Sequence, residues 1–349
     1  MGRRESVAVR FCLSPPVEAG LAWCGCRLES GWAGVSRSQF DSAFFLELWR
    51  VILAGVRFGL LNRGTGEEPV PVRFWCSPPK TKSSNYSGNP GSVEPGYTYV
   101  KNFLFVGDCH ADLDFIERAA DLAAEHNAEM IQLGDFGFLW PGRGGDMLDQ
   151  VSGVLKMSGE KFARPPVVCR WICGNHDWHT KIATLCKTAP KNGTGFELAD
   201  NIIYQPRGST YTDEDGTRFL FVGGASSIDQ ANRTTGLSWW PEEDITESDY
   251  VAAKAAEGPI HVMVTHDAPD YPLGFSPKGS AAFRVRSAQG MEYLRRLMYH
   301  HEPEMLIHGH WHARYSRQDG NTKVVGLDCN YGKFPDAVML WSRELLSGQ

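Results

Sequence analysis

Beyond residue 99 the chain alternates short apolar runs with amphipathic segments. The runs at Phe103–Val106, Met130–Leu133 and Val167–Cys173 have the length and the apolar character of buried β-strands. Between them, apolar residues recur every three to four positions, which predicts helices over Asp112–His126 and near Asp146–Met157. Strands that alternate with helices in this way are typical of βαβ units in a parallel sheet.

The second half of this region repeats the alternation and then adds strands. The turn residues Glu214-Asp215-Gly216 predict a hairpin whose second strand is Arg218–Val222. The remaining predicted elements are, in chain order, helix Ser248–Glu257, strand His261–Thr265, helix Ala288–His300, strand Met305–Ile307, and strands Thr322–Leu327 and Ala337–Leu340. The later strands fit antiparallel additions to the sheets, so the pattern as a whole predicts an α/β fold.

The first 99 residues have a different character. Residues 1–77 mix apolar stretches with Gly, Ser, Arg and Pro without a sustained period, and residues 78–97 are rich in Pro, Gly, Ser and Asn, as in a flexible linker. We therefore divide the chain into an irregular leader with its linker, 1–99, and a globular domain, 100–349. Two hypotheses for the leader stay open. It is an accessory or partner-binding arm, or it is upstream sequence included by an incorrect start codon, with Val100 as the true start.

Composition and charge narrow the class of protein. All 11 histidines lie after residue 99, which places imidazole chemistry in 100–349. The net charge of −6 disfavours long nucleic acid as a partner. No apolar run is long enough to suggest a membrane span, and the N-terminus lacks the apolar core of a secretory signal. The nine cysteines are odd in number and lack paired metal-knuckle spacing, so we expect a reducing, cytoplasmic location.

Five short polar clusters contain the candidate chemistry, and most of them directly follow a predicted strand. In chain order they are Asp108-Cys109-His110, Gly134-Asp135, Gly174-Asn175-His176-Asp177, His266 and Gly309-His310-Trp311-His312. Sites in open α/β sheets form at the carboxyl ends of strands, so we expect the clusters to converge. Carboxylates, imidazoles and an amide are ligands for divalent ions, and two ions about 3.5–4 Å apart can activate a water and clamp a phosphate. The clusters therefore predict metal-assisted hydrolysis.

This series resembles the motifs of the calcineurin-like metallophosphoesterase superfamily, G-D-x-H, G-D, G-N-H-[ED], a lone His and G-H-x-H, in its bacterial and phage members. The resemblance runs from Phe103 to Trp341. It implies a four-layer α/β-β/α sandwich of two mixed sheets flanked by helices, with residues 100–349 as the catalytic domain. The activity it implies is hydrolysis of a phosphate ester, a phosphomonoester or a phosphodiester, by a metal-activated hydroxide.

The resemblance also implies a role for each site residue. The metal ligands would be Asp108, His110 and His312 for the first ion, Asn175, His266 and His310 for the second, and Asp135 as the bridge between them. His176 would bind the phosphate and help protonate the leaving oxygen, and Asp177 would orient His176. The expected cofactor is a pair of divalent metal ions, with Mn²⁺ the first choice and Fe, Zn, Co or Mg as alternatives.

Two segments depart from or extend the motifs. After Asp135 the chain continues Phe136-Gly137-Phe138, which differs from the Val-Asp-Arg-Gly continuation of the Ser/Thr phosphoprotein phosphatases and counts against that activity. The segment from Gly223 to Glu242 resembles an insert of some bacterial and phage members. Within it, Arg233 is the candidate substrate-binding residue, and its alternative role is to pair with a carboxylate in a packed cap.

Two alternative functions remain from the sequence. One is a nuclease or nucleotide phosphodiesterase on the same fold, because fold alone does not separate it from a monoesterase. The other is a non-catalytic metal-binding scaffold, which is disfavoured because every ligand and the catalytic histidine are retained. The expected substrate is a phosphorylated small molecule or a nucleotide, without a membrane partner, and the sequence predicts no particular protein partner.

Overall fold

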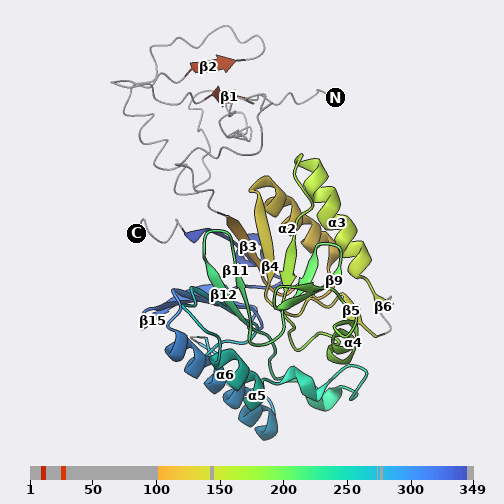
Figure 1. The fold of residues 1–349 in the computed structure, drawn as a ribbon, viewed down its shortest axis with the longest axis vertical. Coiled ribbons are helices and arrows are strands. Elements are labelled where there is room, and N and C mark those ends of the chain that lie inside the picture. Colours follow the sequence, from red (N-terminus) through yellow and green to blue (C-terminus); the bar gives the residue numbers. More distant parts are fainter. Residues whose placement is uncertain are drawn as a thin grey trace, which may run out of the picture. The chain divides into compact units, whose positions relative to one another are not determined.

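The computed structural model describes residues 9–12, 25–28, 101–141, 145–272, 274–275 and 278–343. The chain divides into two units, Met1–Val93 and Glu94–Gln349 (Figure 1). In the first unit, β1 (Val9–Cys12) pairs antiparallel with β2 (Gly25–Leu28), a pair that the irregular sequence of 1–77 did not predict. The rest of the predicted leader and its linker lies outside the described residues, and the origin of residues 1–99 stays a prediction.

The second unit contains a seven-stranded mixed sheet. Its strand order is β17 (Val338–Trp341), β3 (Asn102–Val106), β4 (Ala128–Gln132), β7 (Cys169–Trp171), β10 (Ile202–Tyr204), β9 (Gly195–Ala199) and β8 (Lys191–Asn192). The four strands β3, β4, β7 and β10 are parallel, and β17, β9 and β8 pair antiparallel with their neighbours. The parallel strands therefore end on one edge of the sheet, where the polar clusters begin.

A six-stranded mixed sheet faces the first. Its strand order is β11 (Ser209–Thr212), β12 (Arg218–Val222), β13 (Val262–Thr265), β14 (Met305–His308), β16 (Thr322–Gly326) and β15 (Tyr315–Asp319). The inner four strands are parallel, while β11 and β15 are antiparallel edge strands. The predicted hairpin at Glu214-Asp215-Gly216 joins β11 to β12, as expected from its turn residues.

Helices cover the outer face of each sheet and complete four layers (Figure 1). The first sheet packs against α2 (Leu113–Glu125), α3 (Leu148–Lys161) and α4 (His179–Leu185), and the second against α5 (Glu247–Lys254) and α6 (Ala281–His301). Smaller elements are the β5–β6 pair (Leu139–Trp140, Gly145–Asp146) and the 3₁₀ turns η2 (Gln230–Asn232), η3 (Pro241–Glu243) and η4 (Phe334–Asp336). Among the described helices, none combines the length and the apolar character that a membrane crossing requires.

The alternation of side chains along the strands explains the layering. In β3, Phe103 and Phe105 belong to the core between the two sheets, whereas Leu104 and Val106 pack with the helices outside. Because successive side chains of a strand point to opposite faces, a strand that is apolar throughout must be covered on both sides. The predicted four-layer sandwich of two mixed sheets is confirmed.

Candidate metal centre

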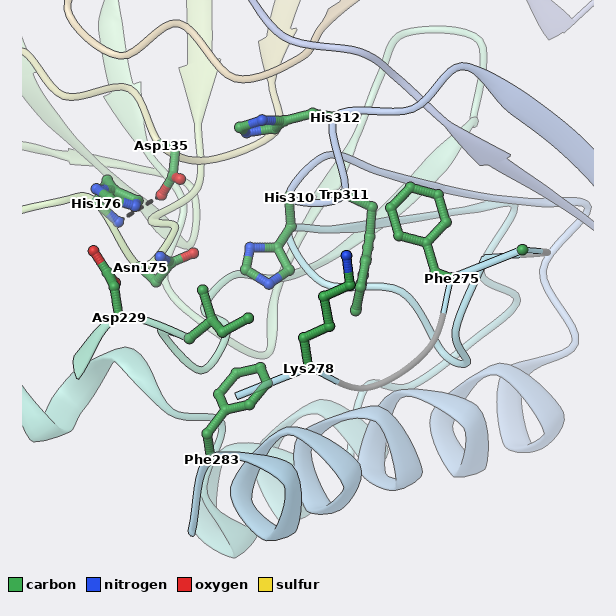
Figure 2. Close-up of a pocket in the computed structure, with 12 residues that line it drawn as sticks. Asp135, Asn175, His176, Asp229, Phe275, Lys278, Phe283, His310, Trp311 and His312 are labelled. Atoms are coloured by element: carbon green, nitrogen blue, oxygen red, sulfur yellow. Dashed lines mark hydrogen bonds between the residues drawn. The ribbon is translucent and has the colours of Figure 1, made fainter. Parts of the chain in front are cut away.

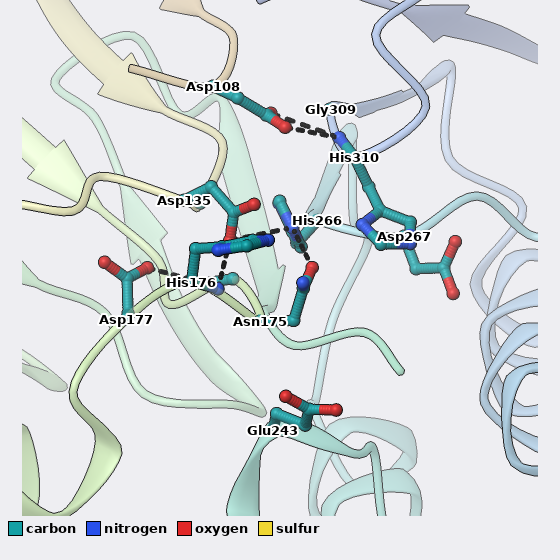
Figure 3. Close-up of polar contacts among 12 residues, drawn as sticks. Asp108, Asp135, Asn175, His176, Asp177, Glu243, His266, Asp267, Gly309 and His310 are labelled. Atoms are coloured by element: carbon teal, nitrogen blue, oxygen red, sulfur yellow. Dashed lines mark hydrogen bonds and ion pairs between the residues drawn. The ribbon is translucent and has the colours of Figure 1, made fainter. Parts of the chain in front are cut away.

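The polar clusters converge at the carboxyl ends of strands from both sheets (Figure 3). Five loops meet there: those after β3, β4 and β7 in the first sheet, and those after β13 and β14 in the second. Within this junction the Nε2 atom of His312 lies 3.0 Å from Oδ2 of Asp108. The structure thus brings together residues that are 204 positions apart in the chain.

Two groups of side chains have the spacing of a metal site. The donor atoms of Asp108, His110 and His312 lie within 4.8 Å of one another, as do those of Asp108, Asp135 and His266. Asp135 lies between two imidazoles: its Oδ2 is 3.6 Å from Nε2 of His110, and its Oδ1 is 3.3 Å from Nε2 of His266. With one oxygen towards each side, Asp135 has the arrangement expected of a bridging ligand.

The other two predicted ligands, Asn175 and His310, adjoin His266. The Oδ1 atom of Asn175 is 3.2 Å from Nε2 of His266, and the ring centroids of His266 and His310 are 5.1 Å apart. The ring of His310 is not part of either compact group, although its backbone N–H donates to Oδ1 of Asp108 at 3.1 Å. All seven predicted ligands therefore lie around one centre, and their roles as ligands remain expectations.

Hydrogen bonds on the far side of two imidazoles set which nitrogen faces the centre. Nδ1 of His266 lies 2.8 Å from the carbonyl oxygen of Leu133, and Nδ1 of His110 lies 2.9 Å from Oδ1 of Asn330. An imidazole that donates through Nδ1 presents the lone pair of Nε2. Asn330, which the motifs did not identify, thereby orients His110.

The backbone at the centre is held in an unusual conformation. Asp135, His110, His310 and His312 all have positive φ, at 52°, 46°, 64° and 47°. Such conformations cost free energy in residues other than glycine and are concentrated at functional sites. A Cβ at Gly174 would lie only 2.2 Å from Oδ1 of Asp135, so the glycine of this motif is required by close approach.

The electrostatics of the centre favour cations. Burial lowers the pKa of His266 and of His312. The carboxylates of Asp135 and Asp108 outweigh this at His266, and Asp108 and the Cys329 thiol do so at His312, which raises the pKa values to about 10 and about 11. Burial also raises the pKa of Asp135, and the surrounding imidazoles reverse that shift and bring it well below its usual range. In the metal-free protein, protons on the imidazoles offset the buried carboxylates. Divalent ions fit this donor set, because they would replace those protons.

A hydrogen-bonded chain fixes the amide of Asn175. Its Nδ2 donates to Oγ of Ser227 at 3.1 Å, and that hydroxyl donates to Oε2 of Glu243 at 2.7 Å. A carboxylate only accepts, so the Ser227 proton goes to Glu243 and the hydroxyl accepts from Asn175. Consequently the Oδ1 atom of Asn175 must face His266. Ser227 and Glu243 were missed as site residues, since neither belongs to a motif.

His176 and Arg233 lie together beside the ligands. The backbone N–H of His176 donates to Oδ1 of Asp135 at 2.6 Å. The Nη2 atom of Arg233 lies 2.7 Å from Nε2 of His176 and also pairs with Asp229 at 2.8 Å. Arg233 therefore has both of the environments considered for it, a carboxylate partner and a position next to the candidate site.

Asp177 contacts backbone rather than the ring of His176. Its carboxylate accepts from the N–H groups of Gly174 at 2.7 Å and Gly137 at 2.9 Å. Among the hydrogen bonds of the described residues, the ring of His176 is bonded by Arg233, so the expected direct bond from Asp177 is not the geometry observed. Asp177 instead closes the turn that contains His176, and its orienting role stays a prediction.

Several solved structures are similar to the chain at low sequence identity. Solved structures similar to the chain include a dimetal phosphatase from Danio rerio (13% identity, 66% of this chain, 88% of that chain, TM-score 0.41). Others are phosphopantetheinyl hydrolase from Mycobacterium tuberculosis (12% identity, 66% and 91%, TM-score 0.37) and GAP50, the anchor in the inner membrane complex of Plasmodium (14% identity, 65% and 70%, TM-score 0.39). No curated protein sequence matches the chain.

The family model described as calcineurin-like phosphoesterase matches residues 101–314. The matched region includes both sheets except for the C-terminal strands and contains every polar cluster, from Asp108 to His312. The convergence of these clusters at the strand ends and the match over most of the second unit lead to one conclusion: the chain belongs to the calcineurin-like phosphoesterase family.

Proposed function

We propose that the protein hydrolyses a small phosphate ester, a monoester or a diester, with two divalent ions of which manganese is the expected kind. One observation carries this proposal: Asp135 lies between the imidazoles of His110 and His266, each within 3.6 Å of one of its oxygens. That placement suits one carboxylate shared by two ions.

The residues of the site would have the following roles. Asp108, His110 and His312 would hold one ion, Asn175, His266 and His310 the other, and Asp135 both. When bound, the ions would supply activation of a water and charge that stabilises the phosphate. His176 would donate a proton to the leaving oxygen. Arg233 would turn from Asp229 to the phosphate, because a guanidinium binds phosphate in a bidentate manner.

A phosphorylated small molecule or nucleotide is the proposed substrate class. The cavity beside the metal centre has a volume of about 680 Å³, within the range of small-molecule sites. The proposed location is the cytoplasm, supported by free thiols at all five cysteines of the second unit: Cys109, Cys169, Cys173, Cys186 and Cys329.

The test is metal-dependent turnover by the full chain. The protein would be stripped of metal, supplied with Mn²⁺, and assayed with p-nitrophenyl phosphate and bis(p-nitrophenyl) phosphate, with Asp135→Asn as control. We expect turnover that needs Mn²⁺ and is lost in the variant, and the ratio of the two rates assigns monoesterase or diesterase activity. Two bound ions without turnover of either substrate would refute the esterase and favour the non-catalytic scaffold.

A further inference from the structure

The cavity beside the metal centre has an apolar part that the proposed reaction does not use (Figure 2). The polar part of its lining consists of four proposed ligands together with His176, Asp229 and Lys278. The rest includes a set of large apolar side chains, called here the apolar wall: Ile228, Phe275, Phe283 and Trp311. Lys278 extends between this wall and His310 and is the one lysine among the lining residues.

Three segments outside the sheets build the wall: Trp311 lies in the loop after β14, and the other two segments pack on each other. Ile228 follows β12, whereas Phe283 lies in the first turn of α6. A Cβ at Gly279, which has φ of +94°, would lie 2.8 Å from the Phe283 ring and 3.0 Å from Ile228. On the next turn of the helix, Arg286 pairs with Asp244 at 2.9 Å. The two segments therefore hold each other in place beside the metal centre.

Trp311 is anchored in a fixed orientation. Its Nε1–H donates to Oδ1 of Asp267 at 2.8 Å, and Asp267 is only 1% exposed. The rings of Tyr271 and Phe275 meet the indole nearly at right angles, with centroids 5.4 Å and 5.5 Å away. Because a buried carboxylate holds the indole, Phe275 has a rigid support.

The wall leaves apolar surface open to the cavity. The side chains of Ile228 and Phe275 are 54% and 44% exposed, whereas Phe283 is 5% exposed and serves as packing beneath them. Open apolar surface beside a polar site is typical of a ligand-binding surface. An exposed cation, Lys278, adjoins this surface and would favour a negative charge on the ligand.

We propose that the substrate is a phosphate ester whose alcohol part carries a flat apolar group and a second anionic group. With the phosphate at the metal centre, the apolar group would lie on Ile228 and Phe275, and the second anion would pair with Lys278. The inference names the substrate class and rests on the proposed function. It can still fail separately, because binding is measurable without turnover.

Three phosphonates, which resist hydrolysis, test each part of the inference by calorimetry on the Mn²⁺-loaded full chain. They are methylphosphonate, benzylphosphonate and 4-carboxybenzylphosphonate. Burial of the phenyl ring should make benzylphosphonate bind roughly tenfold tighter than methylphosphonate. Phe275→Ala should lower this ratio roughly threefold or more. Val285→Ala, which removes a side chain 68% exposed on α6 and absent from the cavity lining, should leave the ratio unchanged.

The added carboxylate tests Lys278. We expect 4-carboxybenzylphosphonate to bind roughly fivefold tighter than benzylphosphonate, a gain that falls as salt rises. Lys278→Gln should remove that gain, whereas Lys156→Gln, on the exposed face of α3, should keep it. A wild-type protein that binds all three phosphonates alike, or ratios that survive Phe275→Ala and Lys278→Gln, would overturn the inference. Discrimination among the phosphonates without turnover of p-nitrophenyl phosphate would instead refute the proposed function alone.

Discussion

Replacing Ser227 with alanine removes the hydroxyl that joins Asn175 to Glu243. Ser227 is 0% exposed, so water does not take the place of the lost oxygen without rearrangement. The change leaves Nδ2 of Asn175 and Oε2 of Glu243 without their partner, while the second carboxylate oxygen keeps the Ser227 backbone N–H at 2.7 Å. Freed from the hydroxyl, the Asn175 amide is able to rotate its oxygen away from His266.

Two buried polar atoms without partners each cost about 1–3 kcal/mol, so the free energy of unfolding of the metal-free protein should fall by about 2–6 kcal/mol. At about 2–4 °C per kcal/mol for a domain of this size, that corresponds to a decrease in Tm of roughly 4–24 °C. Loss of a residue that orients a ligand typically weakens metal affinity about 10- to 100-fold. The affinity for one of the two ions should fall by that factor, and the other should change little.

Ser226→Ala is the matched control. Ser226 is the preceding residue, is 4% exposed, and donates to Oδ1 of Asp244 at 2.6 Å, away from Asn175. Its truncation should lower Tm by a comparable amount and leave metal binding intact. Calorimetric titration with Mn²⁺ would give the stoichiometry and both affinities, and differential scanning calorimetry would give Tm. Wild-type affinity for both ions in Ser227→Ala would refute the argument that this hydroxyl fixes the orientation of the Asn175 amide.

Four further predictions concern the centre itself. Asp135→Asn should abolish metal-dependent turnover, and plasma emission spectrometry should find fewer than two ions per chain; a fully loaded variant would contradict the bridging role. His176→Ala should lower kcat roughly 10²- to 10⁴-fold while both ions stay bound, and loss of metal would contradict its assignment. Arg233→Ala should raise KM for anionic substrates about tenfold or more in steady-state kinetics, and unchanged kinetics would exclude it from the site. Metal affinity should rise with pH by roughly tenfold per unit and per displaced proton. The reason is that His266 and His312, with pKa values of about 10 and about 11, hold protons when metal is absent. A metal affinity that does not change between about pH 6 and 8 in a chelator competition would contradict this.

The sequence predicts the strands and helices well where the pattern of apolar side chains indicates which faces are buried. Apolar runs such as Phe103–Val106 must be covered on both faces, and the structure confirms them as central parallel strands. The predicted helix at Asp112–His126 differs by one residue at each end, because Asp112 is the N-cap and accepts from the N–H of Phe115 at 3.0 Å. These elements are determined locally, by periodicity and capping.

Elements without a strong local pattern were missed. The strands β8 and β9 lie at the sheet edge and are partly exposed, so their sequence lacks a clear apolar period. The helix α6 begins at Ala281, seven residues before the predicted Ala288, because its first two turns carry two arginines and only one strongly buried apolar residue, Phe283. Conversely, only Cys169–Trp171 of the predicted strand Val167–Cys173 pairs with both neighbours, since the following residues already form the loop to Asn175.

The candidate site shows the same division between local and long-range determinants. Motif spacing places the ligands at strand ends, but the orientation of Asn175 and of Trp311 depends on buried carboxylates from outside the motifs. Glu243 orients Asn175 through Ser227 on the metal side, and Asp267 orients Trp311 on the side of the apolar wall. Burial raises the pKa of each carboxyl to about 6. Because a buried carboxyl reduces the stability of the fold, two of them beside one cavity indicate that the fold gives up stability to fix the geometry of this site.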